Sequence, residues 1–151
     1  MTTNNKELIV KKIENGTVID HIPSDKVFAV VRVLGLDIIE DEVLIGTNLE
    51  SKKYGKKGII KATNKFFDNE TIDKLAIIAP TATLITIKNY EVVEKKHLTL
   101  PKQMHNIVKC INPNCVTNIE EIDTMFSVVS EEPLTIQCHY CEKTMSDIKF
   151  K

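Results

Sequence analysis

Short stretches in which apolar and polar residues alternate recur along the N-terminal two thirds of the chain, and each predicts a β-strand. Two other stretches, 27–34 and 72–79, carry apolar residues at helical spacing, and Gly35 and Pro80 are suited to end them. The first strand is expected in two segments, 8–13 and 17–22, the next two strands at 42–49 and 59–63, and the last at 82–87, continuing extended through 89–93. The order is therefore β-α-β-β-α-β, the ferredoxin-like α+β pattern, in which two helices cover an antiparallel sheet.

Polar residues mark where each helix is expected to begin. Ser24 is a suitable N-cap for the first helix, with Asp25 just inside it. Asp68 or Asn69 is expected to cap the second helix. The lysine-rich stretch 51–58, which contains two glycines, is expected to form the loop between the strands 42–49 and 59–63.

The stretch 95–102 is charged, and Leu100 and Pro101 stand near its end. We place a linker within this stretch, at 98–102. It separates a domain at 1–97 from a module at 103–151. In the module, short strands are expected at 124–130, 134–138 and 145–150, so it is a small all-β domain. A piece of about 50 residues rarely buries enough surface to fold alone, and bound zinc contributes roughly 10–16 kcal/mol to the folding of such modules.

The module contains all four cysteines of the chain, in two close pairs. Four residues separate Cys110 from Cys115, and two separate Cys138 from Cys141. This spacing is typical of two zinc knuckles and predicts one structural Zn²⁺ per chain in a tetrahedral Cys₄ site. The alternatives are two disulfides or four unrelated cysteines. Disulfides are disfavoured because nothing in the sequence marks the chain as secreted.

Composition narrows the functional class. The formal net charge is −1, and Arg32 is the only arginine among 20 basic residues. Arginine is the residue that best reads base edges, so a sequence-specific nucleic-acid-binding protein is disfavoured, although a zinc ribbon with a lysine-rich loop remains the alternative function. The polar start and the lack of a long apolar run predict a cytoplasmic protein without a membrane partner.

Two groups of residues are candidates for chemistry in the first domain. Asp20 and His21 are neighbours in an expected strand and should point to opposite faces, which excludes a proton relay, although both could touch one ligand at a sheet edge. The lysine cluster is either solvated or a triphosphate clamp, with Gly55 and Gly58 allowing a close backbone approach. Its members are Lys52, Lys53, Lys56, Lys57 and Lys61.

No catalytic group is evident in the sequence. There is no order of residues typical of a Ser-His-Asp triad and no paired carboxylates in an apolar setting. A closed Cys₄ site leaves no open position for a catalytic water, so a metal-dependent enzyme is disfavoured and we expect a protein that is not an enzyme.

Five motifs in register resemble one family. They are Gly-Thr-Val-Ile-Asp-His-Ile-Pro at 16–23, Ile-Gly-Thr-Asn-Leu at 45–49, Ala-Pro-x-Ala-Thr at 79–83, Asn-Tyr-Glu-Val-Val at 89–93, and the cysteine pairs followed by Glu142. Together they resemble the regulatory chain of aspartate carbamoyltransferase, over essentially the whole sequence. The resemblance implies a non-catalytic allosteric subunit of pyrimidine biosynthesis. Its first domain would bind CTP and ATP, in some members UTP. Its zinc domain would dock on catalytic chains, and regulatory dimers would tie two catalytic trimers together.

The resemblance also implies a nucleotide pocket. Its residues would be Val10, Lys11, Ile13, Val18, Asp20, His21, Lys57, Lys61, Ile87, Tyr90, Val92 and Lys95. Apolar members would sandwich the base, Lys61 would reach the ribose or base, and Lys95 and His21 would face the phosphates. The sequence departs from well-known bacterial members at Lys11, where they carry an acidic residue, and at Ile85, where they carry asparagine.

Overall fold

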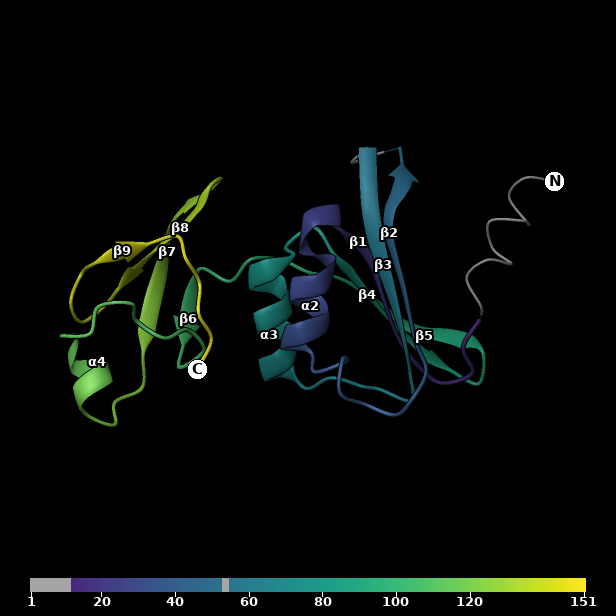
Figure 1. Ribbon diagram of the computed structural model, residues 1–151, viewed down its shortest axis with the longest axis horizontal. Coiled ribbons are helices and arrows are strands. Elements are labelled where there is room, and N and C mark those ends of the chain that lie inside the picture. Colours follow the sequence, from purple (N-terminus) through teal and green to yellow (C-terminus); the bar gives the residue numbers. More distant parts are fainter. Residues whose placement is uncertain (1–11, 53–54) are drawn as a thin grey trace. The chain divides into compact units, whose positions relative to one another are not determined.

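The computed structural model describes residues 12–52 and 55–151. The chain forms two compact units, Met1–Thr99 and Leu100–Lys151, each of which is described by itself. Figure 1 shows the elements of both. No helix among the described residues is long and apolar enough to cross a membrane.

The first unit is an antiparallel sheet with two helices, as the ferredoxin-like order predicts, and a fifth strand extends the four strands of that order. Its elements are β1 (Gly16–Ile22), the 3₁₀ helix η1 (Ser24–Lys26), α2 (Val27–Val33), β2 (Val43–Ser51), β3 (Gly55–Thr63), α3 (Asn69–Ile78), β4 (Thr83–Lys88) and β5 (Glu91–His97). The strands lie in the order β2-β3-β1-β4-β5. The expected strand at 8–13 falls mainly outside the described residues, and residues 12 and 13 are not in a strand. The last strand runs to His97, so the charged residues 95–97 belong to the sheet and extend it beyond the expected end at 93.

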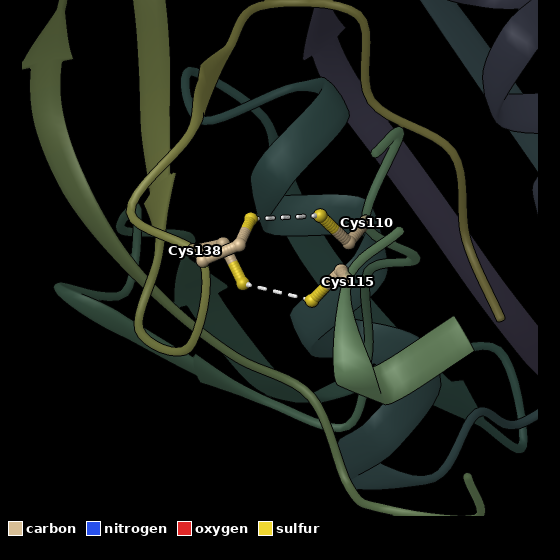
Figure 2. Close-up of side chains that lie close together, drawn as sticks. Cys110, Cys115 and Cys138 are labelled. Atoms are coloured by element: carbon tan, nitrogen blue, oxygen red, sulfur yellow. Dashed lines mark hydrogen bonds between the residues drawn. The ribbon is translucent and has the colours of Figure 1, made fainter. Parts of the chain in front are cut away.

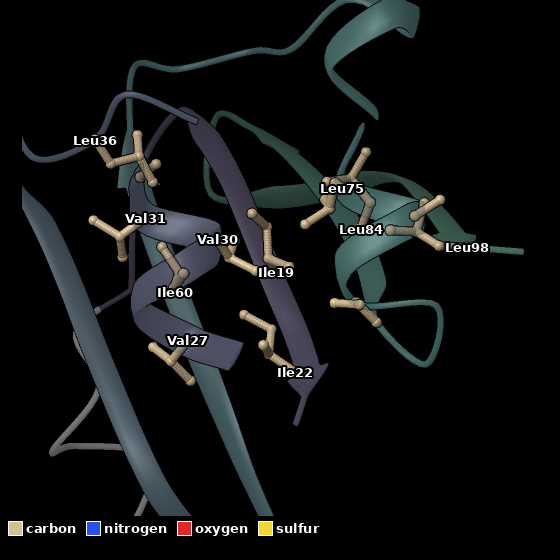
Figure 3. Packing of buried hydrophobic residues seen from close by; sticks show 14 residues of the cluster. Ile19, Ile22, Val27, Val30, Val31, Leu36, Ile60, Leu75, Leu84 and Leu98 are labelled. Carbon is tan, nitrogen blue, oxygen red and sulfur yellow. The ribbon is translucent and has the colours of Figure 1, made fainter. Parts of the chain in front are cut away.

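The two helices lie side by side on one face of this sheet (Figure 1). Alternate residues of β1 and β3, such as Ile19 and Ile60, point toward them and are fully buried. Figure 3 shows these side chains packed against Val27 and Val30 of α2 and against Leu75 of α3. The helices therefore cover one face, and the other, which we call the outer face, is free of them.

The helix ends agree with the sequence at three of four places. The Asp68 carboxylate accepts a hydrogen bond from the Thr71 N–H at 2.8 Å and caps α3 as expected. Gly35 has φ +68° and ends α2, because the Leu36 N–H bonds back to the Val31 carbonyl. Pro80 follows the end of α3 at Ile78 as expected. The expected Ser24 cap is wrong: η1 occupies that position, Lys26 precedes α2, and the Ser24 hydroxyl caps nothing.

Gly58 on β3 is required by packing against α2. A Cβ placed on Gly58 would lie 2.1 Å from Val27 Cγ2, well inside van der Waals contact. The interpretation that Gly58 allows a ligand to approach is therefore wrong, because its missing side chain makes room for the helix. The loop between β2 and β3 is also shorter than expected, since β3 already begins at Gly55.

The second unit is a four-stranded antiparallel sheet in the order β6-β7-β8-β9. Its elements are β6 (Gln103–His105), the one-turn helix α4 (Val116–Ile119), β7 (Met125–Glu131), β8 (Leu134–Cys138) and β9 (Thr144–Met145). Met104, Phe126 and Ile136 are fully buried at its centre. The expected strand at 145–150 is wrong beyond Met145, although Phe150 forms an isolated bridge with Val108. Neither β6 nor α4 is anticipated by the sequence patterns.

Candidate functional site

The first cysteine pair lies on a knuckle that its own polar groups hold closed. The Cys115 N–H donates to the Asn112 carbonyl at 3.0 Å, which makes the tight turn. The Asn118 side-chain amide, from α4, donates to the carbonyls of Cys110 at 2.9 Å and of Asn112 at 2.7 Å. These hydrogen bonds join four positions of one short segment and hold the backbone that carries both thiols.

The second pair lies at the end of β8, where the strand turns back into β9. The Glu142 N–H donates to the Cys138 carbonyl at 3.0 Å, and Glu142 has φ +63°. The Cys138 N–H in turn donates to the Lys143 carbonyl at 3.0 Å. These backbone bonds make a second knuckle, which presents Cys138 and Cys141 on the same side.

The four sulfur atoms form one compact cluster, all within 4.8 Å of one another. The Sγ atoms of Cys110 and Cys141 are 3.7 Å apart, and those of Cys115 and Cys138 are 3.8 Å apart (Figure 2). A tetrahedral zinc site with Zn–S bonds of about 2.3 Å places its sulfurs about 3.8 Å apart, whereas a disulfide needs about 2.05 Å. The residues therefore fit a structural Zn²⁺ held by four cysteines, and all four are free thiols rather than disulfides.

Protonation of these thiols ties metal binding to pH. Burial raises the pKa of Cys110 to about 12 and also raises the pKa of Cys138. At Cys141 burial again opposes ionisation, but hydrogen bonds from the Lys143 backbone and the Asn112 side chain outweigh it and lower the pKa to about 7. Because zinc binds thiolates, its binding must release protons from the buried cysteines.

The outer face of the first unit carries many of the expected pocket residues. In antiparallel pairing, residues directly opposite one another share a face. The register places Lys61 of β3 opposite Val18 of β1, Val18 opposite Ile85 of β4, and Ile85 opposite Lys95 of β5. These four side chains therefore form one row across the outer face.

A second row lies on each side of the first. Toward the β4–β5 turn, Ile87 pairs with Val92. Toward the other end, Asp20 pairs with Thr83, and Thr83 pairs with His97. The outer face thus has an apolar end, a central row with two lysines, and a polar end.

The remaining expected residues are placed as follows. Ile13 is buried, and Tyr90 lies in the β4–β5 turn with φ +66° and 64% of its surface exposed. Val10 and Lys11 lie outside the described residues, as does Lys53 of the lysine cluster. Thr83 and His97 share the outer face but are absent from the expected set.

Asp20 and His21 do not point to opposite faces, which corrects the expectation. A β-bulge interrupts the pairing of β1 with β3 between Ile19 and Ile22, and His21 has φ +58°. The His21 N–H donates to its neighbour's carboxylate, Asp20 Oδ1, at 2.7 Å, and His21 Nδ1 lies 3.9 Å from Asp20 Oδ2. Strict alternation fails at a bulge, so both side chains reach the same end of the sheet.

The lysines of β3 differ in their surroundings. Lys57 Nζ lies 2.8 Å from Asp20 Oδ1, in an ion pair whose side chains are 22% and 19% exposed. Partial burial lowers the pKa of Lys61, the positive charge of Lys12 lowers it further, and Asp20 opposes both. The outer face therefore concentrates positive charge around one carboxylate, and a bound anion would relieve the repulsion.

This two-domain arrangement, an α+β domain followed by a four-cysteine metal-binding domain, is that of a regulatory chain. Two family models match the sequence: aspartate carbamoyltransferase regulatory chain, allosteric domain, over residues 8–99, and aspartate carbamoyltransferase regulatory chain, metal binding domain, over residues 102–151. The chain belongs to the family of aspartate carbamoyltransferase regulatory chains, and it is a non-catalytic component of pyrimidine biosynthesis.

Similar proteins support the same family over nearly the full length. The regulatory chain of Phocaeicola vulgatus is 51% identical over 146 residues, which cover 97% of this chain and 94% of that one. The regulatory chain of Bacteroides thetaiotaomicron is 50% identical over 95% of this chain and 94% of its own length. The regulatory chain of Pyrococcus horikoshii is 48% identical over 93% of this chain and 94% of its own length. The match over both domains favours a regulatory chain over a zinc-ribbon nucleic-acid-binding protein.

Proposed function

We propose that the outer face of the first unit binds a nucleoside triphosphate effector, CTP or ATP and also UTP. The row formed by Lys61, Val18, Ile85 and Lys95 is the observation that carries this proposal. It combines an apolar strip, on which a base can lie, with a lysine at each end of the row that can bind phosphate or ribose oxygens.

The two ends of the outer face suit the two ends of a nucleotide. Ile87 and Val92 offer apolar contact for a base near the β4–β5 turn, where the exposed Tyr90 also lies. Asp20, His21 and Lys57 lie toward the opposite end, where the phosphates would extend. In this arrangement Asp20 positions Lys57 through their ion pair, and a bound anionic ligand would then also contact the Lys57 ammonium group.

The second unit would connect the effector domain to catalytic chains. A groove of about 1170 Å³ lies beside the first cysteine knuckle and is lined by Cys110, Ile111, Ile119, Glu120 and Lys149, among others. Ile119 is 69% exposed, although it lies on the short helix that the zinc knuckle anchors. We assign this groove to contact with the catalytic chain, because two of its apolar residues, Ile111 and Ile119, lie on or next to the cysteine knuckle that a bound metal would hold.

Effector binding would act by biasing a quaternary equilibrium of two catalytic trimers tied together by regulatory dimers. An effector shifts such an equilibrium only by its difference in affinity for the two states. Coupling of this kind is typically about 1–3 kcal/mol, enough to change activity several-fold. All of these interactions would occur in the cytoplasm, where four reduced cysteines can hold zinc.

The test is to combine the purified chain with aspartate carbamoyltransferase catalytic trimers and to measure assembled mass and activity. We expect a complex larger than the trimer, whose activity changes with added CTP or ATP and which dissociates when a chelator removes zinc. A trimer whose mass and activity are the same with and without the chain would refute the proposal.

A further inference from the structure

The two cysteine knuckles of the second unit are held in place by different means. Cys138 belongs to β8, where it pairs with Phe126 of β7, and its N–H donates to the Lys143 carbonyl at 3.0 Å. The second knuckle is therefore an extension of the sheet. Residues 109–115, all of which the structure describes, form the first knuckle and belong to no strand. The first knuckle must therefore be held closed by bonds of its own.

Asn118 of α4 spans this first knuckle. Its side-chain Nδ2 donates to the Cys110 carbonyl at 2.9 Å and to the Asn112 carbonyl at 2.7 Å. Both partners are carbonyl oxygens, which only accept, so both N–H groups of the amide are used. The Asn112 carbonyl also accepts from the Cys115 N–H at 3.0 Å. Asn118 thus joins the segment that carries the first thiol to the turn that carries the second.

Thr117, the neighbour of Asn118, makes a more local contact. Thr117 Oγ1 lies 3.2 Å from Cys115 Sγ. A thiolate that binds zinc carries no proton, so the hydroxyl is the donor in that state. This bond joins residues only two positions apart and can follow Cys115 when the knuckle moves. The bond from Asn118 to Cys110 instead spans eight positions, and it must break before the knuckle opens.

We propose that Asn118 is a positioning residue that acts as a latch on the first knuckle and sets how fast the chain loses its zinc. Cys138 and Cys141 can leave the metal only if the end of β8 moves, which breaks backbone bonds of the sheet. Cys110 and Cys115 can leave together once the Asn118 amide releases the two carbonyls. The first knuckle is therefore the one that opens. Hydrogen-bonding partners outside the ligands of a metal typically change its affinity by about 10–100-fold.

The latch also bears on the groove beside the first knuckle. Cys110, Ile111 and Asn118 all line this groove. Asn118 holds the segment that contains Ile111 against α4, so it fixes one side of the groove as well. This consequence, unlike the latch itself, rests on the proposed function, which assigns the groove to the catalytic chain. Zinc release is measured on the regulatory chain alone, so a failure of the latch and a failure of docking are distinguishable.

The experiment measures the rate of zinc release from the purified full-length chain. An excess of the coloured chelator pyridylazoresorcinol is added to the zinc-loaded chain, and the absorbance of its zinc complex gives the rate. Asn118→Ala should release zinc about tenfold faster than the wild-type chain, because the first knuckle opens without breaking these two bonds. Equal rates for the two chains would overturn the latch.

Gln137→Ala is the matched control on the second knuckle. Gln137 Nε2 also donates to a knuckle carbonyl, that of Glu142, at 3.0 Å. The pairing of β8 with β9 holds that knuckle without this side chain. The control should therefore change the rate of release by less than about twofold. An acceleration as large as that of Asn118→Ala would overturn the assignment of the latch to the first knuckle.

Two further measurements separate the latch from folding. Cobalt-substituted Asn118→Ala should show the wild-type absorption of tetrahedral Co²⁺ bound by four thiolates, because the variant keeps all four ligands. Loss of that absorption would overturn the positioning role, since the variant would then lack the site itself. Asn118→Gln, which retains an amide donor, should release zinc more slowly than Asn118→Ala. Equal release from these two variants would show that the amide donor does not hold the knuckle.

Pulse alkylation of the wild-type chain tests the order of opening without any substitution. In the presence of chelator, iodoacetamide alkylates the thiols as they leave the metal, and peptide mass spectrometry locates the labels. Chains that carry two labels should carry them on Cys110 and Cys115. Labels found first on Cys138 and Cys141 would overturn the latch.

Discussion

Lys57 Nζ and Asp20 Oδ1 lie 2.8 Å apart, with both side chains mostly withdrawn from solvent. Removing one member of such a pair leaves the other charge without its partner, which costs about 1–3 kcal/mol. We predict that Asp20→Ala lowers the free energy of unfolding by about this amount, measured by denaturant titration. Lys56→Met, which changes a neighbouring exposed lysine, is the matched control and should change it by less than about 0.5 kcal/mol. Equal effects of the two variants would contradict the assigned pair.

Gly58→Ala tests the packing of α2 on the sheet. The new methyl group would lie 2.1 Å from Val27 Cγ2, so helix and strand must separate. Overpacking of this kind costs about 1–3 kcal/mol, which denaturant titration measures. In the double variant with Val27→Ala the methyl group has room. The double variant should therefore lose less free energy of unfolding than the sum of the losses in the two single variants. Losses that simply add would show that the contact with Val27 does not require a glycine at position 58.

Zinc content depends on all four cysteines, so Cys115→Ser should abolish it. We predict that the purified wild-type chain contains one zinc per chain by metal analysis and that Cys115→Ser contains almost none. Because the metal folds the second unit, the variant should no longer hold catalytic trimers, while CTP binding by the first unit persists. Thr117→Val, which removes a hydroxyl 3.2 Å from Cys115 Sγ, is the milder control and should retain zinc. A wild-type chain that purifies with no metal would contradict the Cys₄ centre.

Nucleotide affinity should fall at alkaline pH as Lys61 loses its proton. Burial and Lys12 hold the pKa of Lys61 below its ordinary value, so its charge is lost earlier than that of a solvated lysine. A bound anion raises this pKa again, so binding takes up a proton and weakens as pH rises through the pKa that Lys61 has in the chain without nucleotide. Calorimetry with CTP should show this decline moved to higher pH in Lys61→Arg, because arginine stays charged. An identical decline in both chains would exclude Lys61 from the site.

The sequence predicted the regular parts of the chain well, for local reasons. Both helices, the strands β1 to β4 and the Asp68 cap follow from periodicity and capping, which depend on neighbouring residues. The cysteine cluster could be predicted because knuckle spacing fixes the distance between ligands.

The features that the sequence did not predict depend on contacts between residues far apart in the chain. The bulge at His21 breaks alternation, so a rule based on strand period assigned that side chain to the wrong face. The contact of Thr83 with His97 arises from the register of β4 with β5. The alternation of Thr81 and Thr83 with Ala82 and Leu84 was a visible signal that Thr83 lies opposite the core, but not that it meets two histidines. The sequence alone suggested a ligand-binding role for Gly58, because it does not show that this glycine packs against Val27 of α2.

The outer face as a nucleotide site is tested most directly by two adjacent lysines of β5. Lys95 pairs with Ile85 on the outer face, whereas Lys96 pairs with Leu84, whose side chain belongs to the core beneath the helices. Calorimetric titration of CTP should show that Lys95→Ala weakens binding about tenfold or more, as loss of a charge-assisted hydrogen bond implies, and that Lys96→Ala changes it less than about twofold. Equal affinities for CTP in the two variants would contradict the placement of the nucleotide on the outer face.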